Sequence, residues 1–599
     1  MYAGQGHARH THYGRTTEDI FAPIAPTLAL SGRVTLGNAS TVDSIQVNET
    51  WQLSDSLTWT KDRHSIKAGV EILKMRYLNR SGFNTMGSFT FAGVFSGDVA
   101  ADFLLGKAQQ MTVASPYLDQ GGLDTATYMF IQDDWRVTRR LTLNLGLRYE
   151  LPLPWVHPHD EWGTLHPGQQ STVIPAAPLG MVFAGDAGTP RGMIQTDKNN
   201  FAPRVGFAWD AFGSGRTSVR GAFGIFYETI NADIIQNTAQ PFNYTFTIQA
   251  PFSLADPLRG QAPLPLFINF KNPLFVGTQQ VFNADPGLRA PYVEQFNLNV
   301  QHQLVKDLTV QVGYVGKLGR KLLMGWSTNP ALFSPAATTA NIDQRRILQP
   351  YGNNSEISSR ANSSYNGLQV QVNKRFGRGF SLQGAYTFSR SLDIASAFSL
   401  GAAVPNVFDF HTQYALSDFQ AKHIGSFSWL WELPKAGVKN PLIRGVVNGW
   451  QMNGLVSART GLPLNLLLGS DRALSGTPNQ RPDVLRNPVL PSDRARGDRI
   501  AQWFDRTAFA MPALGAYGNT GRNALLGPNS VNTNLALFKN FPLPLREGMH
   551  LQFRSEFFNA LNAVNLNSPN TTLSALANMG RITGAAEARV IQFALKLVF

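Results

Sequence analysis

The sequence contains no cysteine in its 599 residues, which excludes disulfide bonds, thiolate metal sites and cysteine nucleophiles. Charged residues make up only 15% of the chain, whereas aromatic residues make up 11%, and there are 54 glycines and 35 prolines. Solvated helices need more charge than this, while turns and loops use glycine and proline freely. The composition therefore favours an all-β chain.

Long hydrophobic runs are also missing. We find no stretch of about 18 apolar residues that could form a membrane helix, and the mean hydropathy is −0.14. Spanning helices are thereby excluded. A transmembrane β-barrel is compatible with these values, because its apolar and polar faces alternate along each strand and average out.

Positive charge exceeds negative charge, with a formal net charge of +13, but it is not concentrated in one region. Between Arg481 and Arg499, for example, Asp483, Asp493 and Asp498 stand among the arginines. A nucleic-acid interface gathers its basic residues on one helix or patch. We therefore predict no nucleic-acid partner.

The last stretch of the chain, residues 589–599, has the clearest pattern. Every second residue is large and apolar: Ile591, Phe593, Leu595, Leu597 and Phe599. Gln592, Ala594 and Lys596 fall between them, which predicts a β-strand with one apolar face. Eleven residues in a strand tilted by about 45° climb about 25 Å, the height of the apolar band of an outer-membrane barrel. The alternative for this stretch alone is the last strand of a soluble β-sandwich.

The same alternation recurs in pairs of segments joined by short turns, which predicts hairpins. The pairs are 51–60 with 65–72, 128–137 with 141–151, 204–210 with 218–227, 296–301 with 308–314, 368–373 with 380–388, 427–433 with 447–459, and 535–537 with 551–558. An edge strand is predicted near Thr27 to Val34.

Long segments rich in glycine, proline and asparagine separate these hairpins. They cover 76–124, 152–200, 231–291, 317–363, 392–422, 460–530 and 560–588. Short and long connections thus alternate, as in an outer-membrane barrel with short periplasmic turns and long outside loops. We predict a transmembrane antiparallel β-barrel over 27–599, with roughly sixteen strands and both chain ends on the periplasmic side. Segment 1–26 is predicted to be irregular.

Chemistry is not expected. Asp133 and Asp134 resemble a catalytic pair, but neighbours on a strand point to opposite faces. Gly106-Lys107 is followed by Ala108, so it does not match a phosphate-binding loop. His7, His10 and His12 are assigned to an irregular chain end rather than to a metal site. We predict no enzyme activity, no cofactor and no metal.

Four charged residues are predicted to face the barrel interior: Arg148, Glu150, Arg204 and Arg220. Each alternates with apolar neighbours, so the opposite side of its strand faces lipid. We expect them to contact water, one another or a plug inside the barrel.

The chain also resembles a known family through motifs that occur in order over most of its length. These are SLTWT (56–60), FIQDDWRVT (130–138), LTLNLGLRYE (141–150), NFAPRVGF (200–207), YVEQFNL (292–298), NSSYN (362–366), NGWQ (448–451), GNTGRN (518–523) with Gly527 and Pro528, and FRSEFFN (553–559). The family is that of the TonB-dependent outer-membrane receptors, specifically their Oar-like branch.

The resemblance implies a barrel in the bacterial outer membrane, plugged by an amino-terminal domain and energised by TonB to import scarce nutrients. This sequence shows no TonB box, no plug and no secretory signal in Met1 to Pro23, and its strand number is short of the ~22 of plugged transporters. We therefore interpret it as the carboxy-terminal barrel part of such a protein, with TonB acting through a missing plug domain. The alternatives are a structural or adhesive surface protein and a passive porin, and the substrate is not readable.

Two effects can be separated on the final strand, where Phe593, Leu595, Leu597 and Phe599 are predicted to face lipid. An arginine at the bilayer midplane costs ~2 to 4 kcal/mol, so Leu595→Arg should weaken the folded barrel more than Lys596→Arg. Deleting Phe599, at the periplasmic rim, should change refolding little. It should lower assembly in cells, because the resemblance implies that the assembly machinery reads an aromatic last residue. The amount of heat-modifiable barrel in membranes measures assembly in cells, and the amount in detergent measures refolding. Normal assembly of the Phe599 deletion in cells would refute the assembly signal.

Overall fold

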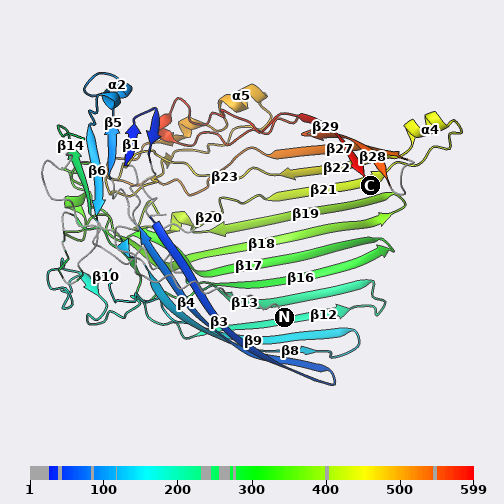
Figure 1. The fold of residues 1–599 in the computed structure, drawn as a ribbon, viewed down its shortest axis with the longest axis horizontal. Coiled ribbons are helices and arrows are strands. Elements are labelled where there is room, and N and C mark those ends of the chain that lie inside the picture. The colour runs from blue at the N-terminus through cyan, green and yellow to red at the C-terminus, as the bar shows by residue number, and fades with distance from the viewer. Residues whose placement is uncertain are drawn as a thin grey trace.

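The computed structural model describes residues 26–37, 44–81, 87–115, 118–119, 121–230, 244–254, 270, 272–273, 275, 278–397, 404–543 and 549–599. The predictions for residues 1–25, including the three N-terminal histidines, lie outside these ranges. The described chain is nearly all β and is dominated by one large antiparallel sheet that curls into a barrel (Figure 1). The predicted fold class is confirmed.

Fifteen long strands of the described chain build this sheet. They are β3 (Ser44–Lys61), β4 (His64–Ser81), β8 (Gly122–Trp135), β9 (Leu141–Pro152), β12 (Asn200–Asp210), β13 (Thr217–Tyr227), β16 (Tyr292–Val305), β17 (Leu308–Ser327), β18 (Ser355–Gly377), β19 (Phe380–Asp393), β21 (His423–Glu432), β22 (Trp450–Arg459), β27 (Ser530–Pro542), β28 (His550–Phe558) and β29 (Val590–Val598). Each strand pairs antiparallel with the next of the series, from β3–β4 to β28–β29. Three short strands join its margin: β7 (Leu118–Asp119), β15 (Phe282–Ala284) and β20 (Ala415–Leu416).

The registers give this sheet two chemically different faces, because residues directly opposite one another in paired strands share a face. Leu145 is opposite Val205, and Val205 is opposite Phe223. These residues belong to what we call the apolar face. The residues that alternate with them along each strand make up the polar face. Asn144, which is opposite Gly206, is an example. The alternation predicted from the sequence is confirmed for these hairpins.

The strand ends differ in the same systematic way (Figure 1). At one end the connections are short, as at Asp62 between β3 and β4, where a φ of 52° makes the tight turn. At the other end, drawn at the left, the long segments gather into what we call the loop cap. The C-terminus lies at the short-turn end, as predicted.

The prediction of roughly sixteen strands agrees with the fifteen long strands of the described chain. The predicted place of the first strands needs correction, because β3 runs from the loop cap toward the short-turn end. The predicted edge strand near Thr27 to Val34 belongs to a separate five-stranded sheet in the loop cap. That sheet has the order β14 (Tyr244–Gln249), β6 (Gln110–Ser115), β5 (Ser88–Phe91), β1 (Thr27–Leu30) and β2 (Val34–Leu36). Its apolar side chains pack on one another and on α2 (Val99–Leu104) rather than on the barrel.

Two predicted connections are also wrong. Segment 317–363 contains strand at both of its ends, because β17 continues to Ser327 and β18 starts at Ser355. The supposed short turn after β21 is instead a longer connection that contains helix α4 (Pro441–Val447), so β22 begins at Trp450 rather than at 447. The helix is nucleated by Asn440, whose side chain accepts hydrogen bonds from the amides of Leu442 and Ile443, and by Pro441 in the first turn.

Small elements complete the loop cap. The short strands are β10 (Gly163–Leu165) paired with β11 (Met181–Phe183), β23 (Pro463–Leu464) paired with β26 (Leu525–Leu526), and β24 (Asp483–Val484) paired with β25 (Phe509–Ala510). The helical turns are α5 (Arg496–Ala501), η1 (Asp343–Arg345), η2 (His411–Gln413), η3 (Arg506–Ala508) and η4 (Leu573–Ala575). Within the described ranges, no helix is long and apolar enough to cross a membrane.

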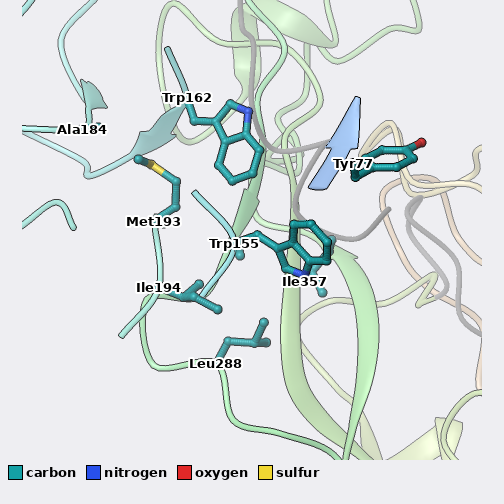
Figure 2. Close-up of a cluster of buried hydrophobic side chains, with 9 residues drawn as sticks. Tyr77, Trp155, Trp162, Ala184, Met193, Ile194, Leu288 and Ile357 are labelled. Atoms are coloured by element: carbon teal, nitrogen blue, oxygen red, sulfur yellow. The ribbon is translucent and has the colours of Figure 1, made fainter. Parts of the chain in front are cut away.

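Buried apolar side chains concentrate in the loop cap. One cluster joins the end of β4, the β9–β12 loop, the segment around β15 and the start of β18, with Trp155 and Trp162 at its centre (Figure 2). A second cluster joins the β22–β27 loop to the β28–β29 loop through residues such as Leu466, Phe504 and Met579. The cap thus has hydrophobic cores of its own, one of which also contacts the ends of barrel strands β4 and β18.

We expect Phe504→Ala to loosen the loop cap while the sheet persists. Phe504 is 1% exposed, and truncating a buried phenylalanine costs about 3 to 5 kcal/mol. Limited proteolysis should then cut within 460–529 faster than in the parent protein, while the heat-modifiable barrel band stays unchanged. Phe212→Ala, at a 73% exposed position in the β12–β13 turn, is the control and should alter neither measurement. If the barrel band were lost while cleavage of the loop stayed normal, the claim that the loop cap loosens independently of the sheet would be contradicted.

Candidate functional site

The four charged residues predicted to share one side of the sheet do so. Arg148 and Glu150 are two residues apart on β9 and therefore share a face. Gly146 lies on that same face and is opposite Arg204. Arg220 is opposite Ala208, which lies on the same face of β12 as Arg204. All four therefore belong to the polar face, and our assignment of this face to the barrel interior remains a proposal.

Arg148 is the centre of a charge cluster on three adjacent strands. Its Nε lies 2.9 Å from Oε1 of Glu150, and its Nη2 lies 3.6 Å from Oε2 of Glu71 on β4. Its guanidinium also stacks 4.6 Å from the ring centroid of Tyr128 on β8. Tyr128 in turn shares a hydrogen bond of 3.2 Å with the hydroxyl of Thr229. The cluster holds these strands together beneath the loop cap.

Arg204 and Arg220 have a different environment. The guanidinium of Arg204 lies 4.6 Å from the ring centroid of Phe226, and Nε of Arg220 donates to Oγ of Ser218 at 3.1 Å. Neither arginine forms an ion pair with any described residue. Both line a hollow of about 590 Å³ on the polar face, together with amide side chains such as Asn144. The hollow therefore presents two arginines, amide groups and one carboxylate, that of Asp134.

Asp133 and Asp134 lie on opposite faces, as predicted. Asp133 is opposite Leu145 and its carboxylate lies 2.6 Å from Nδ1 of His64, whereas Asp134 accepts a 2.6 Å hydrogen bond from the amide of Asn144. Two carboxylates on opposite sides of a sheet cannot act on one substrate. In the described chain, no group of three or more histidine, aspartate or glutamate side chains is placed to hold a metal ion.

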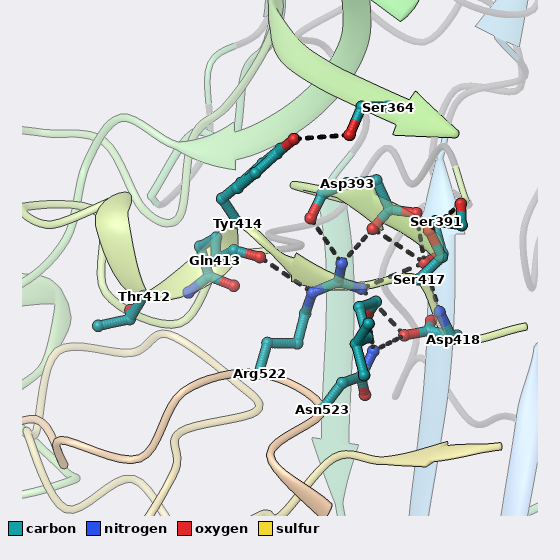
Figure 3. Close-up of polar contacts among 12 residues, drawn as sticks. Ser364, Ser391, Asp393, Thr412, Gln413, Tyr414, Ser417, Asp418, Arg522 and Asn523 are labelled. Atoms are coloured by element: carbon teal, nitrogen blue, oxygen red, sulfur yellow. Dashed lines mark hydrogen bonds and ion pairs between the residues drawn. The ribbon is translucent and has the colours of Figure 1, made fainter. Parts of the chain in front are cut away.

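The loop cap contains a buried polar centre around Arg522, which we call the Arg522 clasp (Figure 3). Arg522, in the β22–β27 loop, is paired with Asp393 at the end of β19 and lies 2.9 Å from Oδ1 of Asp418 in the β19–β21 loop. Its Nε also donates to the carbonyl of Gln413 at 3.1 Å. The neighbouring Asn523 donates to Asp418 at 2.6 Å. One side chain therefore joins two long loops and a barrel strand.

A second arginine extends the clasp. Nη1 of Arg481 donates to Oε1 of Gln413 at 3.2 Å, and its Nη2 donates to the hydroxyl of Thr412 at 3.1 Å. Burial, together with the nearby positive charge of Arg522, lowers the pKa of Arg481 to about 10. Arg481 therefore remains protonated at neutral pH and keeps its charge in these hydrogen bonds.

Further contacts make the loop cap continuous. The backbone amide of Ala331, in the β17–β18 loop, donates to the carbonyl of Ser475 in the β22–β27 loop at 2.9 Å. Thr477 of that loop donates to the carbonyl of Pro405 in the β19–β21 loop at 2.8 Å. Tyr351 of the β17–β18 loop packs against the β9–β12 loop in a third hydrophobic cluster.

Asp186 organises the β9–β12 loop locally. Burial alone would raise the pKa of this carboxyl, but hydrogen bonds from the hydroxyls of Ser171 and Thr172 and from backbone amides outweigh burial and lower the pKa to about 2. The carboxylate therefore stays charged and holds the loop closed at neutral pH. Sequence reasoning missed both Asp186 and the Arg522 clasp as structural centres, although the GNTGRN motif contains Arg522 and Asn523.

Comparison with known proteins fits this architecture. A family model described as an outer membrane beta barrel domain matches residues 3–592. The chain belongs to this outer-membrane β-barrel family. Membership places it in the bacterial outer membrane, as predicted from the resemblance.

Three known proteins similar to this barrel are transporters by name. The TonB-dependent transporter Oar of Myxococcus xanthus is 25% identical over 213 residues, which cover 33% of this chain and 16% of Oar. The outer membrane transporter YddB from Escherichia coli has the same fold, with a TM-score of 0.50 and 11% identity over 92% of this chain and 54% of YddB. The FrpB iron transporter from Neisseria meningitidis is matched over 92% of this chain and 55% of FrpB, with 10% identity and a TM-score of 0.43. The barrel thus spans about a sixth of Oar and about half of the two solved structures.

These matches confirm the resemblance to TonB-dependent receptors and to Oar. The predicted domain boundaries, interior residues and assembly signal are not tested by them. Those assignments stay predictions.

We expect Arg522→Met to open the clasp. It would leave Asp393 buried without its partner, and breaking a buried ion pair costs about 3 to 5 kcal/mol. Arg486→Met is the control, because Arg486 pairs with Asp505 at 3.0 Å with its own side chain 55% exposed, and an exposed pair contributes about 1 kcal/mol or less. Hydrogen exchange in 404–422 and 510–529 should rise strongly only in Arg522→Met. Equal exchange in the two variants would show that the clasp does not hold the loops.

Proposed function

We propose that this barrel belongs to a receptor and transporter that takes up a nutrient across the outer membrane, driven by the TonB system. In this proposal the polar face lines the interior, the apolar face meets lipid, and the loop cap forms the outer surface that first meets the substrate. TonB acts through a plug domain inside the barrel, and the barrel assembly machinery inserts the chain. The transporters that it resembles support this reading, since Oar and YddB are both named as such.

The continuity of the loop cap is the observation that carries the proposal. Hydrophobic clusters and the Arg522 clasp join long loops that start from different strands of the sheet. A passive porin needs an open mouth, whereas a receptor needs a defined outer surface. A packed cap above a polar sheet face fits the receptor better.

Within the barrel, the Arg148 cluster and the two arginines of the hollow divide the polar face. The first is neutralised by Glu150 and Glu71, whereas Arg204 and Arg220 form no ion pair with a described residue, although Asp134 also lines the hollow. We infer that the hollow contacts water or an acidic group of a plug, and that the Arg148 cluster is structural. No substrate is assigned to either group.

Uptake into whole cells that produce the full-length protein, with and without a working TonB system, tests the proposal. The probes are a labelled ferric chelate, a labelled oligosaccharide and a labelled peptide. We expect at least one probe to accumulate above its outside concentration only when TonB works. Equilibration of small probes without TonB would identify a passive porin, and absence of uptake of every probe, with the protein assembled at the surface, would favour an adhesive or structural role.

A further inference from the structure

The connection between β21 and β22 departs from the other connections at the short-turn end. It covers residues 433–449 and includes the seven-residue helix α4. The side chain of Asn440 accepts from the amides of Leu442 and Ile443 at 2.9 and 3.3 Å. Asn448 closes the connection by pairing with the backbone of Ala436 in both directions. Side-chain hydrogen bonds therefore stabilise both the start of the helix and the closure of the connection around it.

One side of α4 is apolar and uncovered. Leu442, Ile443, Val446 and Val447 are spaced so that they share one side of a helix, and their exposed fractions are 82%, 51%, 64% and 40%. A helix of two turns is marginal in water unless its apolar side packs on something. No residue of α4 is buried in the described chain.

The position of α4 indicates what covers it. Nε1 of Trp450 donates to the carbonyl of Val446 at 2.8 Å. Trp450 is opposite Lys539, Lys539 is opposite Phe553, and Phe553 is opposite Leu595, so Trp450 belongs to the apolar face of the sheet. The helix thus continues the apolar face at the short-turn end, where Figure 1 draws it beyond the strands.

Charge adds a second indication. The connection contains Lys435, Lys439 and Arg444 and no acidic residue, and none of the three forms an ion pair with a described residue. Nearby, Lys539 lies 5.7 Å from the ring centroid of Trp450 and donates to the carbonyl of Asn448. Tryptophan and basic residues are typical of the membrane interface, and a short amphipathic helix with basic flanks suits a surface of acidic lipids.

We propose that α4 is a membrane-interface anchor. Its apolar side enters the boundary between headgroups and acyl chains of the leaflet at the short-turn end, and Lys435, Lys439 and Arg444 bind anionic phospholipid headgroups. The anchor fixes the height of β21 and β22 in the bilayer. This inference rests on the outer-membrane location and is independent of transport.

A fluorescent label can test the anchor, because the chain has no cysteine of its own. Ile443→Cys, and separately Leu442→Cys, would carry an environment-sensitive nitrobenzoxadiazole label. Ser214→Cys, in the exposed β12–β13 turn at the same end, is the matched control. Each variant is folded into vesicles of phosphatidylcholine, with or without phosphatidylglycerol, containing doxyl-labelled lipid as quencher, and heat-modifiability confirms folding.

We expect blue-shifted emission and roughly threefold stronger lipid quenching at 442 and 443 than at 214, as for a helix embedded at the interface. Phosphatidylglycerol should increase the quenching, and the double change Lys439→Ala with Arg444→Ala should remove that increase. Water-like emission at both helix positions in folded protein would overturn the proposal. The proposal would also be overturned if quenching increased with the amount of protein per vesicle and not with the amount of doxyl lipid. That result would indicate that a second copy of the chain covers the helix. A label shielded only after a soluble protein is added would indicate a protein partner and would overturn it equally.

Discussion

The backbone hydrogen-bond ladder is the constraint on which this structure depends. In a bilayer there is no water to satisfy amide and carbonyl groups, so a chain without spanning helices must pair every strand with a neighbour. The fifteen long strands do this in sequence order, each antiparallel to the next. Once the ladder is fixed, the two-residue period of a strand decides which side chains lie on the apolar face and which lie on the polar face. A slip of one residue in the register would exchange the two faces.

The same constraint explains why the hydrophobic cores lie in the loop cap. In the proposed arrangement, a hollow sheet has no interior to fill with apolar side chains, and its apolar face meets lipid. Leu298 on β16, for example, is 49% exposed within the protein alone. The long loops have no lipid to cover them, so they bury Trp162, Phe504 and similar side chains among themselves, and they join through the Arg522 clasp. The molecule is thus stabilised in two ways, by lipid and backbone pairing along the strands and by ordinary cores and buried polar contacts above them.

The sequence predicted the parts that repeat with a local period. The alternation in the final strand and in the β8–β9 hairpin is visible in a few consecutive residues, and the registers confirm it. The loop contacts were not predictable in this way, because Arg522 and Asp393 are 129 residues apart and no local period links them. Helix α4 was missed for another reason: residues 434–446 were read as a turn and Val447 as the start of the return strand, although Asn440-Pro441 is a helix-start signal. The length of β17 and β18 was underestimated because glycines and serines within them resemble loop composition.

The central claim is that one face of the sheet meets lipid and the other meets water. Leu368 and Gln371, both on β18, belong to opposite faces, since Leu368 is opposite Tyr314 and Gln371 is opposite Gln311. Each can be changed to cysteine in a chain that has no other, and labelled with a spin label after folding into vesicles. The account predicts that oxygen, which concentrates in lipid, relaxes the label at 368 more strongly, and that a water-soluble nickel chelate relaxes the label at 371 more strongly. The opposite order would contradict the register, and equal access of both reagents at both positions would contradict a membrane-spanning sheet.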